Sequence, residues 1–251
     1  MDIRPYKKDL FYSYALGAFP TLELLKHHPD EAIKIYIHSS FQNQEVLNRI
    51  NEYRGRCEIE FNDRMIGKLS QKENCYVIGV FRKYVTPLKN DHHVVLVNPS
   101  NMGNLGTILR SAIGFRIENI AIIRPGVDLF DPKVIRASMG AVFSCNIAYF
   151  SSYSDYLSAF PDHRIYTFML QAKRELQRAE FERKRFCSLV FGNESSGLDP
   201  SFLDENSLII RHSEAIDSLN LPISVAIGLY EFRKQIGGTK AEETEIFLEK
   251  K

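Results

Sequence analysis

The sequence predicts an α/β protein in which a larger unit, built on a mostly parallel sheet, follows a smaller α/β unit. Three observations predict this class. Short apolar runs typical of strands alternate with helix-length amphipathic stretches along most of the chain. Residues 82–93 carry few apolar side chains and separate two such series. Polar and glycine-rich loops directly follow several of the apolar runs in the second series, as at ligand sites of open α/β sheets.

The amino-acid composition limits the size of the core, the kind of partner and the location that can be expected. The 251 residues are 44% hydrophobic and 25% charged, enough for one large core or two smaller ones. A net charge of +1 neither favours nor excludes a nucleic-acid partner. No apolar run has the length of a membrane span and the first residues lack a signal-peptide layout, so a cytoplasmic protein without membrane contact is expected. The scattered cysteines lack metal-ligand spacing, which predicts free thiols and no metal site; they are Cys57, Cys75, Cys145 and Cys187.

The first series, residues 9–81, predicts a compact unit of alternating strands and helices. Its expected elements are a helix within 15–29, on the spacing of Leu16, Leu22 and Leu25, a β-rich run at 32–40, an amphipathic helix within 41–55, an alternating strand at 57–63 and a strand at 75–83. The last run is largely apolar, which is typical of a central strand.

The second series predicts a regular β-α-β-α succession. Strands are expected at 94–97, 119–123, 145–149, 164–169, 187–191 and 207–210. Helices are expected at 104–114, 131–140, 153–160, in the charged stretch 173–184, near 200–204 and at 220–236. The predicted division is a domain at 1–86, a linker at 87–93 and a domain at 94–251, whose tail from about 237 is either a short docked helix or frayed.

Three loops carry the candidate site. The loop 98–104 contains three asparagines and leads into a helix, where Gly103 and Gly106 allow close backbone approach and free N–H groups favour a polar or anionic ligand. It is not a dinucleotide fingerprint, because Arg124 stands where the next strand would carry an acid. A nucleotide-binding oxidoreductase is therefore disfavoured. A purely structural turn followed by an exposed helical arginine is the alternative for this loop alone.

The other two loops also follow predicted strands. Gly192 and Glu194 end one strand, and Ser218 and Asn220 precede the long helix 220–236. Each loop taken alone could serve its own helix, with Glu194 as a helix-entry acid and the other two as caps. Together, polar loops at the carboxyl ends of parallel strands indicate one shared cleft.

These three segments, in this order, resemble the three signature motifs of the SpoU/TrmH family of RNA ribose 2′-O-methyltransferases, in the SPOUT superfamily. The matching stretches are NPSNMGNLGTILRSA, LVFGNESSGL and DSLNLPISVAIGLYE, with VIRASMGAVF between the first and second. More weakly, LGAFPTLELLK and LSQKENCYVIGVF are similar to the L30e-like substrate-binding domain that often precedes the catalytic domain.

The resemblance implies a trefoil-knotted catalytic domain that binds S-adenosyl-L-methionine and acts as a homodimer on RNA, ribosomal in preference to transfer RNA. By motif position, the cofactor contacts fall at Gly192, Ile210 and Leu219. The catalytic set would be Arg110, Asn104, Glu194, Ser218 and Asn220. Arg110 is expected to grip a phosphate and stabilise the developing alkoxide; a direct role as base is less favoured, because arginine normally stays protonated. Asn104 would hold the ribose or orient Arg110, and Glu194 would orient polar partners.

One departure keeps alternatives open. Relatives usually carry Ile-Pro-Met before the third motif, whereas here Ile210 is followed by Arg211 and His212. The added charge leaves a non-catalytic RNA-binding relative without cofactor binding as the main rival; a transfer-RNA methyltransferase is the other alternative. The segment 171–186 holds six Lys and Arg among three Glu, which predicts a solvated helix or, alternatively, a surface that faces RNA. The pairs His27-His28 and His92-His93 are expected to be exposed.

Overall fold

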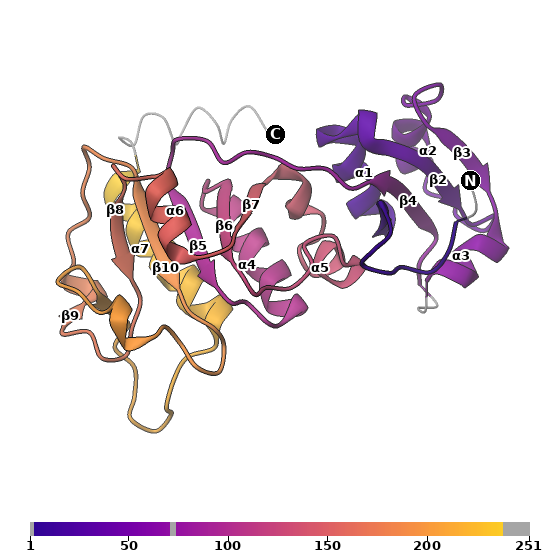
Figure 1. Cartoon of the computed structure of the whole chain (residues 1–251). Coiled ribbons are helices and arrows are strands. Elements are labelled where there is room, and N and C mark those ends of the chain that lie inside the picture. The colour runs from indigo at the N-terminus through magenta and orange to yellow at the C-terminus, as the bar shows by residue number, and fades with distance from the viewer. Residues whose placement is uncertain (1–2, 71–73, 238–251) are drawn as a thin grey trace.

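The computed structural model describes residues 3–70 and 74–237 and contains two separate sheets, one toward each end of the chain (Figure 1). A four-stranded sheet has the order β1-β4-β2-β3, and a five-stranded sheet has the order β7-β6-β5-β10-β8. A further parallel pair, β11-β9, is connected to the end of β8 by a single bridge between Phe168 and Leu208. No helix among these residues is long and apolar enough to cross a membrane.

The four-stranded sheet arises from the first series. Its elements are β1 (Tyr12–Leu16), α1 (Ala18–His27), η1 (Pro29–Glu31), β2 (Ala32–Ile37), α2 (Gln44–Asn51), β3 (Glu58–Phe61), α3 (Asp63–Leu69) and β4 (Val77–Arg82). Strand β4 pairs antiparallel with both β1 and β2, so the prediction of a central apolar strand is confirmed. The placement of Leu16 in a helix was wrong. Leu16 ends a strand that was not predicted, and Gly17, at φ 111°, separates that strand from α1.

The five-stranded sheet arises from the second series. Its strands and the helices around them are β5 (His93–Val97), α4 (Met102–Gly114), β6 (Asn119–Ile123), α5 (Pro132–Ala137), η2 (Ala141–Ser144), β7 (Asn146–Phe150), α6 (Tyr153–Ala159), β8 (Arg164–Thr167), β9 (Arg174–Glu175), η3 (Leu176–Arg178), β10 (Cys187–Phe191), η4 (Pro200–Phe202), β11 (Leu208–Ile209) and α7 (Leu221–Ile236). Every pair in this sheet is parallel, which confirms the predicted class.

Helices cover both faces of this sheet. Val94 and Leu96 of β5 face one core together with residues of α4 and α7. Val95, between them, faces a second core that contains Tyr156 of α6. Alternate residues of a buried strand thus serve opposite layers. Because all the strands run in one direction, their carboxyl ends and the loops that follow them lie along a single edge.

Three predicted helices differ from the structure. Residues 173–184 contain no α-helix: β9 pairs with β11, which draws Arg174 and Glu175 into extended backbone despite a helix-like spacing of apolar residues, and Leu176–Arg178 form only a short 3₁₀ helix. The helix near 200–204 is a single 3₁₀ turn. The helix expected at 131–140 ends at Ala137, because Met139 and Gly140 both adopt positive φ. The predicted tail lies outside the described residues beyond Gly237.

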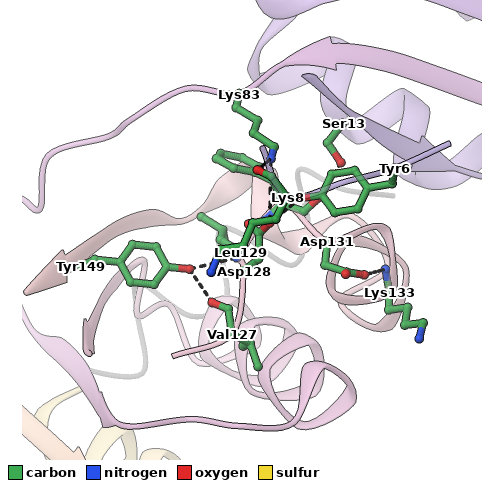
Figure 2. A network of polar contacts seen from close by, with 11 residues as sticks. Tyr6, Lys8, Ser13, Lys83, Val127, Asp128, Leu129, Asp131, Lys133 and Tyr149 are labelled. Atoms are coloured by element: carbon green, nitrogen blue, oxygen red, sulfur yellow. Dashed lines mark hydrogen bonds and ion pairs between the residues drawn. The ribbon is translucent and has the colours of Figure 1, made fainter. Parts of the chain in front are cut away.

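The two sheets are joined through the loop after β6, whose polar contacts Figure 2 shows, and through α5 and η2, which contact β1 and α1. Tyr6 donates a hydrogen bond to the carboxylate of Asp128, and Lys83 Nζ lies 3.8 Å from the same carboxylate. Ser13 Oγ donates to the carbonyl of Phe130. The Phe81 ring of β4 packs edge-on against Phe130, 5.8 Å between centroids. Polar and aromatic contacts therefore hold the first sheet against the second unit. The division at 86 and 93 remains a prediction.

His93 contradicts the expected exposed histidine pair. Its side chain is buried, with Nε2 2.8 Å from the carbonyl of Lys89 and Nδ1 2.9 Å from the hydroxyl of Tyr156. Burial lowers the pKa of His93 to about 4, so the ring is neutral at physiological pH. His93 thus anchors the segment between the two sheets to β5 through buried hydrogen bonds.

Candidate functional site

The carboxylate of Glu194 joins the second polar loop to the first. It accepts hydrogen bonds from Ser100 N at 3.1 Å, Ser100 Oγ at 2.8 Å and Asn101 N at 3.1 Å. Asn104 Nδ2 lies 3.3 Å from the same group. The loop after β10 and the loop that enters α4 are therefore one connected structure at the carboxyl edge of the sheet.

These contacts set the ionisation of Glu194. Partial burial raises the pKa of this carboxyl, but hydrogen bonds from its own backbone N–H, from Ser100 and from Asn101 outweigh burial and hold the pKa below its usual value. Glu194 is therefore ionised at neutral pH and acts purely as an acceptor. It cannot serve as a general acid there. Its role in the described structure is to fix the loop that carries Asn104.

Glu194→Gln tests this role. The amide keeps the shape but loses one acceptor and the charge, so we expect the free energy of unfolding to fall by about 1–3 kcal/mol at neutral pH. Because the folded-state pKa of Glu194 is depressed, its stabilising effect is present above the ordinary value of 4.5 and is lost as pH falls below that value. Denaturant titrations of both proteins should converge toward about pH 3. A stability difference that stays constant over this range would contradict the assignment.

Asn193 and Asn98 fix the backbone between the loop after β5 and the loop after β10. Asn98, at the end of β5, adopts φ 52°, which is uncommon for a side chain other than glycine. Its carbonyl accepts a hydrogen bond from Asn193 Nδ2 at 2.7 Å. Asn193 Oδ1 accepts from Ser195 N at 2.9 Å and Ser196 N at 3.2 Å, which closes the turn that leads to Gly197. The backbone at this edge is thus fixed by side-chain amides.

A partly open pocket of about 200 Å³ lies beside these loops. Aromatic and aliphatic side chains form much of it, with Phe168 stacked on Phe191 at 4.2 Å between ring centroids. Gly192 forms part of the wall, where a Cβ would lie 2.1 Å from the carbonyl carbon of Gly197. Only glycine allows the chain to fold back so closely. Five predicted site residues line the pocket: Gly192, Glu194, Ile210, Ser218 and Leu219.

The unusual loop after β11 does not place its arginine charge in the pocket. Arg211 Nε donates to Glu175 Oε1 at 3.0 Å, and Arg211 is not among the residues that line the pocket. His212 does line it, with Nδ1 2.9 Å from the carbonyl of Ile210. The departure from the motif therefore adds a polar ring to the wall and an ion pair outside it.

The remaining predicted residues lie apart from the pocket wall. Asn104 stands in the first turn of α4, half-buried and in contact with Glu194. Arg110 is exposed one and a half turns later, and its side chain forms no hydrogen bond or ion pair with the described residues. Asn220 occupies the N-cap position of α7, but its side chain makes no capping hydrogen bond. Asn104, Arg110 and Asn220 are thus not among the residues that line the pocket.

Some contributors were not singled out from the sequence. Ser100, Asn101 and Asn193 carry the hydrogen bonds that fix the loops, and Phe168 forms an aromatic wall. Their positions directly after predicted strands were the signal in the sequence that could have identified these residues. Their hydrogen bonds to side chains and backbone of distant loops left no such signal. Within the described residues, no group of three or more His, Cys, Asp or Glu could hold a metal ion.

Comparisons with known proteins agree on one family. The model of the SpoU rRNA Methylase family matches residues 91–230. An uncharacterised tRNA/rRNA methyltransferase from Synechocystis is 32% identical over 146 residues, which covers 57% of this chain and 53% of that protein. The 23S rRNA (guanosine(2553)-2′-O)-methyltransferase of Bacillus subtilis is 29% identical over 136 residues, 52% of this chain and 53% of that one. This chain therefore spans about half the length of these relatives.

The likeness extends further in structure. The AdoMet-bound rRNA methyltransferase from Sinorhizobium meliloti superposes with a TM-score of 0.77, covering 91% of this chain and 89% of that one, at 24% identity. At this identity the superposition establishes a shared fold, and it includes both sheets.

Proposed function

Because this chain belongs to the SpoU rRNA methylase family, we propose that it transfers a methyl group from S-adenosyl-L-methionine to a ribose 2′-hydroxyl in RNA. Ribosomal RNA is the favoured substrate and transfer RNA the alternative, since relatives are named for both. The observation that supports this most directly is Glu194, which lines the pocket and at the same time binds the loop that carries Asn104. The Glu194 carboxylate would therefore connect the side of the site that binds the cofactor with the side that binds the RNA.

The pocket suits S-adenosyl-L-methionine in its chemistry. Gly192, Ile210 and Leu219 would hold the cofactor, with backbone groups at Gly192 and apolar surface from the other two. Phe168 offers a ring face, and Ser218 a hydroxyl, at the same wall. When bound, the cofactor supplies an electrophilic methyl group. Few polar groups converging on a mostly apolar wall are typical of small-molecule sites.

Arg110 and Asn104 would bind and orient the RNA. The Arg110 guanidinium forms no hydrogen bond or ion pair with the residues that the structure describes, so it would bind the phosphate next to the target ribose. The same charge would stabilise the negative charge that develops on the 2′-oxygen as its proton passes to solvent water. Asn104, held by Glu194, presents the remainder of its amide for the ribose. In-line alignment of the reacting atoms supplies the rest of the rate.

We further propose a homodimer. Ile223, Ile227 and Tyr230 project from one side of α7 at helical spacing and are 51%, 37% and 60% exposed. Such an apolar stripe favours a self-complementary contact with a second copy of α7. Arg110 lies on α4, which packs beside α7, and does not line the pocket of its own chain. A dimer would allow Arg110 to serve the partner's pocket.

Other parts of the assignment rest on the resemblance. Residues 1–86 are proposed as the L30e-like unit that reads the RNA, and the catalytic unit is proposed to carry the trefoil knot. A cytoplasmic location fits a substrate made and processed there. The rival without cofactor binding is disfavoured, because the charge of Arg211 is paired with Glu175 away from the pocket.

Calorimetry with S-adenosyl-L-methionine tests the cofactor, and a methyl-transfer assay tests the reaction. We expect saturable binding and transfer of labelled methyl groups to ribosomal RNA from a strain that lacks the gene. Transfer to tRNA instead would select the alternative substrate. Absence of binding heat at millimolar cofactor would remove the enzyme assignment and leave an RNA-binding relative.

A further inference from the structure

The stretch 134–143, which comprises most of α5 and of η2, packs directly on α4, the helix that carries Arg110. A Cβ on Gly106 of α4 would lie 2.4 Å from Ala137 Cβ and 2.8 Å from Ser138 N. Helices α4 and α5 therefore approach more closely than side chains normally permit. Solvent-facing residues on either side of this contact belong to one continuous surface.

Positively charged side chains lie on that surface, on both α4 and α5. Arg110 follows Gly106 by about one turn of α4 and is exposed. Lys133 and Arg136 are exposed on α5 and, three residues apart, share one face. None of these three side chains forms a hydrogen bond or ion pair with the described residues. Figure 2 shows Lys133 pointing away from the Asp128–Lys83–Tyr6 contacts.

Nearby acids are already engaged. Asp131 Oδ1 accepts from the backbone N–H of Lys133 at 2.8 Å. Glu23, which lies against Gly140, has an oxygen 3.5 Å from His27. The positive charge of Lys133 and Arg136 is therefore not neutralised by an acid among the described residues.

Helix α5 also leads from α4 to the four-stranded sheet, as Figure 1 shows. Gly140, just beyond it, approaches Pro20 and Glu23 of α1. Helix α5, which carries Lys133 and Arg136, itself packs against β1 of that sheet. The exposed cations thus span the space between the ribose side of the site and the first unit.

We propose that Lys133 and Arg136, together with Arg110, form a phosphate-binding strip that guides the RNA backbone from the target ribose toward residues 1–86. The inference rests on the proposed function and names the path of its substrate. Unpaired surface cations on a shared face match a phosphate backbone, and such contacts position nucleic acid without reading sequence.

The segment 171–186 is the competing surface. It carries more cations, but Glu175 there pairs with Arg178 at 3.4 Å and with Arg211 at 3.0 Å, and Glu180 and Glu182 interleave with the others. Arg183 and Lys184 are exposed and provide a matched pair of charges for comparison.

The test compares Lys133→Gln/Arg136→Gln with Arg183→Gln/Lys184→Gln in the full-length protein. Fluorescence anisotropy with labelled fragments of deproteinised ribosomal RNA, without cofactor, gives Kd at several salt concentrations. We expect the strip variant to bind roughly tenfold more weakly, with a salt slope smaller by about 1.4–1.8 for two lost phosphate contacts. The comparison variant should bind like the unaltered protein. Arg136→Lys, which keeps the charge, should retain most of the affinity.

Several results would overturn the strip: unchanged affinity in Lys133→Gln/Arg136→Gln, an equal loss in both double variants, or no RNA binding by the unaltered protein. Thermal melts check that each variant is folded. If the strip variant loses RNA affinity while the unaltered protein binds no S-adenosyl-L-methionine, the strip stands and the methyl-transfer proposal fails. The two proposals therefore fail separately.

Discussion

Arg110→Ala is expected to lower kcat for RNA methylation by about 100- to 1,000-fold, the usual consequence of removing a group that stabilises developing charge. The Kd for S-adenosyl-L-methionine should stay within about twofold, since Arg110 does not line the pocket. The fold should also be unaffected, because the side chain is exposed and contacts no described residue through a hydrogen bond or ion pair. Single-turnover methylation with saturating cofactor and RNA measures the effect.

Two matched variants sharpen this result. Arg110→Lys keeps the charge but loses the planar fork, so it should recover part of the rate if electrostatic stabilisation dominates. Thr107→Ala removes an exposed side chain from the same face of α4, whose hydroxyl binds only the carbonyl of Gly103, and should leave the rate near its original value. Loss of cofactor binding in Arg110→Ala would contradict the assignment, because it would place this residue on the wrong side of the site.

The larger unit was predictable from sequence because its central strands β5, β6 and β10 are buried on both faces. Strands 119–123 and 187–191 have the predicted bounds, and the loops that follow β5 and β10 were placed correctly. Segment 173–184 was not predictable in the same way. Its apolar residues have helical spacing, and only pairing of Arg174 with Leu208, far away in sequence, makes the backbone extended. The local pattern of apolar residues contains no information about pairing with a strand far away in the sequence.

His93 shows a similar limit at a single residue. Next to His92 in a polar segment, it has the local features of an exposed side chain, yet Tyr156 and Lys89 supply both partners that an imidazole needs for burial.

The candidate site was predictable as a set of loops but not as a set of contacts. Gly192, Glu194 and Ile210 all reach the pocket wall, as parallel strands require. The bonds from Ser100 and Asn101 to Glu194 cross more than 90 residues of sequence, as do those from Asn193 to Asn98, and no spacing rule indicates them. The pairing of Arg211 with Glu175 is of the same kind.

Gly192→Ala is expected to weaken S-adenosyl-L-methionine binding by at least about 100-fold. The new Cβ would lie 2.1 Å from Gly197 C and 2.4 Å from Leu198 N, so the turn that forms one wall of the pocket must move. Overpacking of this kind also costs about 1–3 kcal/mol of stability. Gly67→Ala on α3 is the control, because nothing lies within 4 Å of its Cβ position and alanine favours a helix. Calorimetry and thermal melts report the two effects. Unchanged cofactor affinity in a folded Gly192→Ala protein would place the cofactor elsewhere.

The two variants together test whether Arg110 serves the partner's pocket. In a mixed dimer, the Arg110→Ala subunit keeps an intact pocket and the Gly192→Ala subunit keeps an intact arginine. If each site combines the pocket of one subunit with the arginine of the other, co-expressed and doubly tagged mixed dimers regain one working site of two. Mixed dimers should then show about half of the original activity, although each parent is inactive. If Arg110 acts within its own chain, both sites in the mixed dimer carry a defect and no activity returns. Recovery therefore separates a shared active site from a dimer that merely brings two independent sites together.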